Sequence, residues 1–133
     1  GEADLPAAFD VIVVNHVLEH VTDLPAFLAA AAARLAPAGR LFINVPNLDG
    51  LVPALMKANW GALWPHQHVW QFTPATLRAA VERAAPLKAE AIRTDTNLEP
   101  PSVGVKGLAK AAVVALSTAI GRGDEIRAVF RRA

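Results

Sequence analysis

Four polar residues follow an apolar run near the start of the chain: Asn15, His16, Glu19 and His20 come after Val11–Val14. A histidine, with an unperturbed pKa of about 6.5, can act as a general base near neutral pH or orient a substrate. Polar groups that leave a buried strand must be solvated or paired, and a binding cleft offers both. Two simpler interpretations stay open: Asn15 and His16 only end a strand, and His20 only caps or packs the next helix.

Glu19 and His20 are neighbours in the sequence. If they lie in a helical turn, their side chains diverge by about 100°, so they cannot both point at one atom.

The segment 47–71 has no sustained hydrophobic period and is rich in aromatic residues. It contains Trp60, Trp64, His66, His68 and Trp70. On an extended segment, His66 and His68 would point to the same side, which admits a metal site. The chain has no cysteine, and no acidic residue close in sequence supplies a third ligand, so we expect no metal here. The tryptophans could instead line a pocket or simply fix the loop to the core.

The elements that position these residues follow from periodicity. Val11 to Asn15 is predicted to be a strand covered on both faces, as in parallel sheets flanked by helices. In such sheets ligands bind beyond the carboxyl ends of the strands. The apolar spacing from Leu24 to Leu35 predicts a helix that Thr22 or Asp23 can cap and that Pro37 and Gly39 end. Leu41 to Val45 predicts the next strand. Strand, helix and strand then form a right-handed crossover with parallel strands.

The second half of the chain continues with alternating elements. The sequence predicts a short helix at 51–57, a helix capped by Thr73 with Pro74 at its first position, a strand at 88–96, a helix at 107–120 and a closing strand at 125–132. The helix at 107–120 is apolar almost all round but too short to cross a bilayer. We expect it to belong to the core or to an oligomer contact.

The composition fits one globular domain spanning residues 1–133, because 53% of the residues are hydrophobic. A formal net charge of +1 gives no electrostatic case for binding nucleic acid or an anionic membrane. The absence of cysteine excludes disulfides and thiolate chemistry. No signal peptide is visible, and the expected location is cytoplasmic.

Several segments together resemble the later half of the class I S-adenosylmethionine-dependent methyltransferases, in their small-molecule branch. The matching segments are Phe9 to Ile12, Leu18 to Val21, Leu35 to Leu41, Val45 to Asn47 and His68 to Leu77. The resemblance implies a Rossmann-like α/β fold, with a mostly parallel sheet and an antiparallel last strand. It makes 11–15, 41–45, 88–96 and 125–132 the fourth to seventh strands of the family. The glycine-rich first motif of the family is not among these residues.

The resemblance also implies a function and a site. S-adenosylmethionine would be the cofactor, and a small molecule would accept the methyl group on oxygen, nitrogen or carbon. The implied cofactor-binding residues are Asn15, His16 and Glu19, the catalytic residues are His20 and His68, and the substrate-binding residues are Trp60, Trp64 and His66. Aromatic faces would favour the sulfonium by about 0.5–2 kcal/mol through cation–π attraction.

Two rival interpretations remain. The chain could be a non-catalytic half-domain that acts through dimerisation or a partner protein, because the edge of the 11–15 strand would otherwise stay unpaired. It could also be a metal-dependent hydrolase that uses His66 and His68, which would bring bound zinc or iron.

Overall fold

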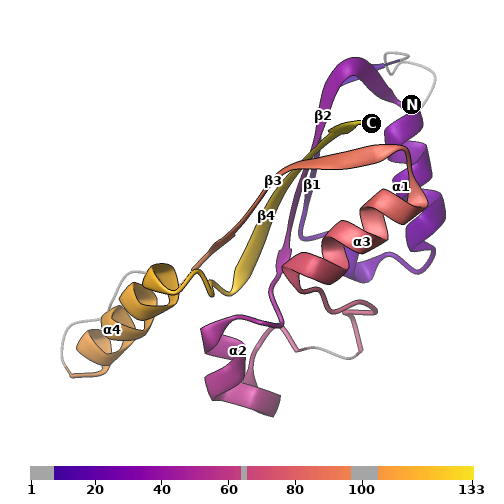
Figure 1. Cartoon of the computed structure of the whole chain (residues 1–133). Coiled ribbons are helices and arrows are strands. Elements are labelled where there is room, and N and C mark those ends of the chain that lie inside the picture. Colours follow the sequence, from indigo (N-terminus) through magenta and orange to yellow (C-terminus); the bar gives the residue numbers. More distant parts are fainter. Residues whose placement is uncertain (1–7, 64–65, 97–104) are drawn as a thin grey trace.

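The computed structural model describes residues 8–63, 66–96 and 105–133. Figure 1 shows a twisted sheet with two helices against one of its faces and two further helices beyond one end of the strands. The strands are β1 (Phe9–Asn15), β2 (Leu35–Pro46), β3 (Leu87–Asp95) and β4 (Glu125–Arg132). The helices are α1 (Leu24–Ala33), α2 (Leu51–Met56), α3 (Pro74–Ala84) and α4 (Val105–Ala119), with 3-10 turns η2 (Leu18–His20) and η3 (Lys57–Asn59).

The strand order is β1-β2-β4-β3. β1 and β2 run parallel, whereas β4 lies between β2 and β3 and is antiparallel to both. The predicted Rossmann-like sheet with an antiparallel last strand is therefore confirmed. Because β4 begins at the edge where β1 and β2 end, its first residue lies beside the carboxyl ends of the two parallel strands.

Strand β2 begins at Leu35, six residues before the predicted start at Leu41. The pairing with β1 shifts between Phe9 and Val11, so the early part of β2 is irregular. Gly39 belongs to this part, and a Cβ on it would lie 2.8 Å from the carbonyl oxygen of Phe9. The sequence signals that end the helix thus also mark a tight approach between two backbones.

Both helices that cover the sheet are capped by side chains. Asp23 precedes α1 and accepts a hydrogen bond from the backbone N–H of Ala26 at 3.0 Å. Thr73 precedes α3 and forms a reciprocal capping box with Thr76. These caps satisfy N–H groups that a helix start leaves without partners, and they confirm the predicted starts.

The core lies between the sheet and the face covered by α1 and α3. Its fully buried side chains are Leu28, Leu35, Leu41, Ile43, Val45, Leu77, Val81, Ile126 and Phe130. The opposite face of the sheet is open among the described residues: Val11 is 54% exposed and Val13 is 67% exposed. The prediction that this strand is covered on both faces is wrong for the described chain. An unbroken apolar run shows that a strand can be covered twice, but it does not say what covers it.

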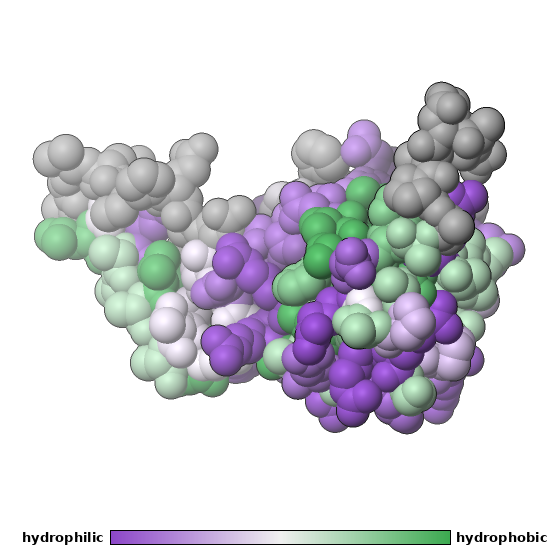
Figure 2. All heavy atoms as spheres, turned by 90° about the horizontal axis from the view of Figure 1, so that it is seen from above, coloured by the Kyte–Doolittle hydropathy of each residue, from purple (hydrophilic) through white to green (hydrophobic). Residues whose placement is uncertain are grey.

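Helix α4 lies beyond one end of the strands (Figure 1) and contacts α2, and several of its apolar side chains are exposed. Leu108 is 73% exposed, and Leu116 and Ile120 are also exposed. Figure 2 looks down on Figure 1 and shows apolar residues at the surface both on this projecting part, at the left, and on the part that contains the sheet. No helix within the described ranges is long and apolar enough to span a membrane.

The one-sided core makes a testable prediction about two phenylalanines. Phe130 is fully buried on the helix-covered face, whereas Phe42 is 39% exposed on the other face. Phe130→Ala should lower the free energy of unfolding by about 3–5 kcal/mol. Phe42→Ala should lower it by about 1 kcal/mol or less, because it leaves little cavity. Urea unfolding followed by circular dichroism measures both. Equal losses would mean that the second face is also covered in solution.

Candidate functional site

The chain leaves β1 through a sharp turn at His16. Its φ is 50°, in the left-handed region that a non-glycine residue seldom adopts, and its backbone N–H donates to the carbonyl of Asn44 at 2.9 Å. Surrounding contacts must hold such a conformation, which costs of order 1–3 kcal/mol. The turn sends the chain out of the sheet and directly into η2.

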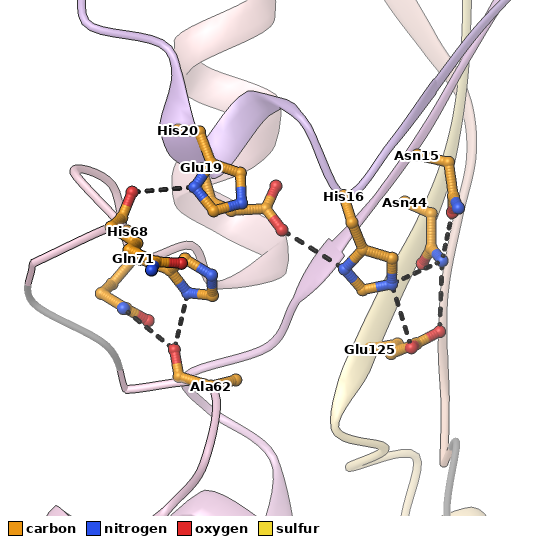
Figure 3. A network of polar contacts seen from close by, with 10 residues as sticks. Asn15, His16, Glu19, His20, Asn44, Ala62, His68, Gln71 and Glu125 are labelled. Atoms are coloured by element: carbon orange, nitrogen blue, oxygen red, sulfur yellow. Dashed lines mark hydrogen bonds and ion pairs between the residues drawn. The ribbon is translucent and has the colours of Figure 1, made fainter.

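Those contacts come from two carboxylates on either side of the His16 ring. Nδ1 lies 3.3 Å from Oε1 of Glu19, and Nε2 lies 3.3 Å from Oε1 of Glu125. The side chains of Glu19 and Glu125 are 1% and 9% exposed. Figure 3 shows the imidazole bridging the turn after β1 and the first residue of β4. One side chain therefore connects two elements that lie far apart in the sequence.

Two asparagines continue this network across the sheet. Asn15 and Asn44 are register partners at the ends of β1 and β2. Asn44 Nδ2 donates to Asn15 Oδ1 at 2.9 Å and to Glu125 Oε2 at 3.2 Å. Glu125 also lies 3.8 Å from the Arg127 guanidinium. The predicted residues Asn15 and His16 therefore belong to one polar cluster at the carboxyl ends of the parallel strands.

Glu125 and Asn44 were not predicted from the sequence. Asn44 interrupts the apolar run of β2, which is a signal of the same kind as Asn15 in β1. Glu125 carries a subtler signal, because it opens a strand that the family resemblance makes antiparallel. An antiparallel strand starts at the edge where its parallel neighbours end, so its first residue faces the site.

The loop that follows α2 and η3 is fixed over the turn η2 by Trp70. Its indole N–H donates to the carbonyl of Val21 at 2.7 Å, and its backbone N–H donates to the carbonyl of Glu19 at 3.1 Å. Trp60, at the start of this loop, is buried. The two bonds of Trp70 therefore hold this part of the loop against η2. Trp64, which the resemblance places in the substrate pocket, lies outside the described residues.

The structure brings His20 and His68 together, although they are distant in the sequence. Their ring centroids lie 4.7 Å apart in an edge-on arrangement. Nδ1 of His20 lies 2.8 Å from the carbonyl of Gln67, and Nδ1 of His68 lies 2.7 Å from the carbonyl of Ala62. His66 is exposed on the same loop. Glu19 Oε1 lies against His16 and the His20 ring against His68, yet one ligand atom of each residue lies within 4.8 Å of the other (Figure 3). The divergence expected for neighbours in a helical turn therefore does not keep these two side chains apart.

Two buried acceptor atoms in this region have no hydrogen-bond partner among the described residues: Oε2 of Glu19 and Oδ1 of Asn44. A buried acceptor without a donor is destabilising by about 1–3 kcal/mol, and by more when it is charged. Both atoms therefore fit a ligand that brings a donor or a positive charge. A groove of about 700 Å³ borders Asn15 and Asn44 and runs along the open face of the sheet.

S-adenosylmethionine meets this requirement in its chemistry, because it carries an amino group and a positive sulfonium. The site offers it acceptor oxygens and carboxylates at the strand ends, where open α/β sheets bind ligands. The residues present therefore fit the cationic part of this cofactor.

Comparison with known proteins agrees with this geometry. The family model described as "Methyltransferase domain" matches residues 1–84. A ubiquinone biosynthesis O-methyltransferase of Idiomarina loihiensis is 35% identical over 86 residues, which are 60% of this chain and 35% of that protein. The Methylobacterium nodulans enzyme of the same name is 37% identical over 82 residues, 57% of this chain and 33% of its own. The chain thus spans about a third of the length of these relatives.

Solved structures share the fold. A complex between the Haloferax volcanii Trm112 methyltransferase activator and a methyltransferase matches with a TM-score of 0.64 at 14% identity, covering 97% of this chain and 57% of that one. A Thermotoga maritima S-adenosylmethionine-dependent methyltransferase matches with a TM-score of 0.62 at 15% identity, covering 98% and 60%. With its strand order, its polar strand ends and a family match over most of its length, this chain belongs to the class I S-adenosylmethionine-dependent methyltransferases.

Proposed function

We propose that this protein serves in the transfer of a methyl group from S-adenosylmethionine to a small-molecule acceptor, on oxygen, nitrogen or carbon. The observation that carries the proposal is the polar cluster of His16, Glu19 and Glu125 at the strand ends of a methyltransferase fold. The relatives named ubiquinone biosynthesis O-methyltransferases favour an acceptor of the phenol or quinol class.

On the cofactor side, the bound S-adenosylmethionine supplies the reactive methyl group on its sulfonium. Asn15 and His16 border the position where its methionine part would lie, and Glu19 holds the His16 ring in place. Asn44 adds a buried Oδ1 that lacks a donor and can accept from an amino group. These residues bind and orient the cofactor, and they offer negative charge to its cationic centre.

On the acceptor side, we assign His20 and His68, with Trp60, Trp64 and His66 of the loop as the wall of the pocket. Methyl transfer is an in-line displacement, so alignment and exclusion of water matter most. A hydroxyl acceptor must also lose its proton. His20 can take that proton, because its Nδ1–H donates to the carbonyl of Gln67 and its Nε2 then carries the lone pair.

A second candidate function is a non-catalytic half-domain that is completed by a partner or by a second copy. The observation that favours it is the open face of the sheet, with Val11 and Val13 exposed. β1 also has a single hydrogen-bonded neighbour strand among the described residues, which leaves one edge unpaired. This candidate predicts association without cofactor binding.

Titration calorimetry with S-adenosylhomocysteine separates the two candidates. The methyltransferase proposal predicts saturable binding with a dissociation constant of about 1–100 µM. Asn15→Ala should weaken binding about fivefold to tenfold, because it removes about one net hydrogen bond from the site. Asn59→Ala is the matched control, since Asn59 is an exposed residue of η3, and its binding should equal that of the unmodified chain. Absence of binding together with a dimer in light scattering would support the half-domain instead.

The role of His20 has its own test, in which labelled methyl transfer is measured against a panel of phenols, quinols and sugars. For a hydroxyl acceptor, His20→Gln should lower kcat about 10²–10⁴-fold. It should leave the affinity for S-adenosylhomocysteine unchanged. Gln67→Ala is the control, because the bond from His20 runs to the backbone carbonyl of Gln67. A His20→Gln variant with unchanged kcat would refute the general-base role.

A further inference from the structure

Three side chains with metal-binding atoms converge beside the polar cluster. Glu19 and His20 come from the turn η2, and His68 comes from the loop that covers it. One oxygen or nitrogen atom from each residue can be chosen so that all three lie within 4.8 Å of one another. Figure 3 shows the His20 ring above the His68 ring, with the Glu19 carboxylate next to His20. This convergence is a tertiary feature, because the two segments are far apart in the sequence.

The hydrogen bonds of the two histidines fix which nitrogen of each ring carries the lone pair. A backbone carbonyl only accepts, so Nδ1 of His20 and Nδ1 of His68 must each carry the proton that they share with Gln67 and Ala62. The lone pair of each ring then lies on Nε2. A histidine that donates its other N–H to a backbone carbonyl is the usual form of a metal ligand, because that bond sets the tautomer and the ring orientation.

Glu19 provides an independent observation. Its side chain is 1% exposed, and Oε1 contacts Nδ1 of His16. The second oxygen, Oε2, is buried and has no hydrogen-bond partner among the residues that the structure describes. A carboxylate oxygen in that position is stabilised by a cation or a donor that the described residues do not supply.

We propose that Glu19 Oε2, His20 Nε2 and His68 Nε2 bind one divalent transition-metal ion of the Zn²⁺ type. Two imidazoles and one carboxylate suit zinc, cobalt or iron(II), whereas magnesium and calcium prefer oxygen ligands. Ligand atoms at about 2.0–2.1 Å from a tetrahedral zinc ion lie about 3.3 Å from one another. Side-chain rotations that move each ligand atom by roughly 1 Å would bring the three atoms to this spacing. The exposed side of His20 leaves a fourth position for water.

The other histidines of the chain do not belong to this site. The His16 ring is held between Glu19 and Glu125, and His66 is exposed outside the group of three. The sequence predicted no metal at His66 and His68 because no acidic residue is near them in the chain. The structure brings the acidic ligand from η2. A bound ion would also tie the loop to this turn, next to the acceptor side of the site.

Metal binding by tag-free protein, stripped with a chelator, tests the proposal directly. Calorimetric titration with Zn²⁺ should give one ion per chain, and Co²⁺ should give the intense visible absorption of a four-coordinate site. Glu19→Gln, which keeps the size of the side chain, and His68→Ala should each weaken Zn²⁺ binding by about 100-fold or more. His66→Ala is the matched control on the same loop, and its affinity should stay within about twofold of the unmodified value.

Circular dichroism of each variant confirms that lost binding is not lost folding, and Glu19→Gln keeps the test valid if His68→Ala unfolds. Absence of saturable Zn²⁺ binding would overturn the proposal. Equal losses of Zn²⁺ affinity in His66→Ala and His68→Ala would also overturn it, because they would indicate that an exposed pair of histidines binds the ion. The inference does not rest on the proposed function, and it replaces the general-base role of His20, because the single lone pair on Nε2 cannot bind an ion and accept a proton at the same time. Titration with S-adenosylhomocysteine is a separate measurement, so failure of one leaves the other standing.

Discussion

The burial of the Glu19 carboxylate is the constraint on which the candidate site depends. A carboxylate with 1% exposure is tolerated only where positive charge or hydrogen-bond donors surround it. One oxygen finds the His16 ring, which in turn reaches Glu125. The position of His16 depends on this arrangement, because its backbone adopts a left-handed conformation that local sequence preference does not favour. The exit from β1, the turn η2 and the start of β4 are therefore fixed together.

The backbone of Glu19 also helps to hold the loop that contains Trp70 in place. The carbonyl of Glu19 accepts from the N–H of Trp70, and the indole of Trp70 donates to Val21 nearby. Two bonds from one tryptophan thus hold the loop at the end of the parallel strands. His68 lies two residues before Trp70, which brings its ring to His20. The pairing of the two histidines follows from this attachment rather than from any feature of the segment around His68.

How much could be predicted from the sequence depended on the range of the interactions. The helix starts at Thr73 and Asp23 follow from local capping, and the antiparallel direction of the last strand follows from the family resemblance, so both were predicted correctly. Coverage of β1 on both faces was predicted wrongly, because hydrophobicity reports what a strand can bury and not what is present to bury it. The contacts of Glu19 with His16 are local, but those of His16 with Glu125 and of His20 with His68 require the folded chain. Strand-end position predicted that Asn15 and His16 would be polar neighbours of a cleft, but not their partners.

The site divides into two halves that share Glu19. On one side, His16, Asn44 and Glu125 form a network whose unsatisfied atom is an acceptor on the sheet. On the other side, the imidazoles of His20 and His68 come from η2 and the loop, and each has a ligand atom within 4.8 Å of a carboxylate oxygen of Glu19. A cationic cofactor centre and a metal ion would repel each other if they met at the same oxygen. Oε1 is already in contact with the His16 ring, so Oε2 is the oxygen left for a ligand, and the proposed cofactor and the proposed metal ion compete for it. With an ion on Glu19, the buried acceptor left for the amino group of the proposed cofactor is Oδ1 of Asn44.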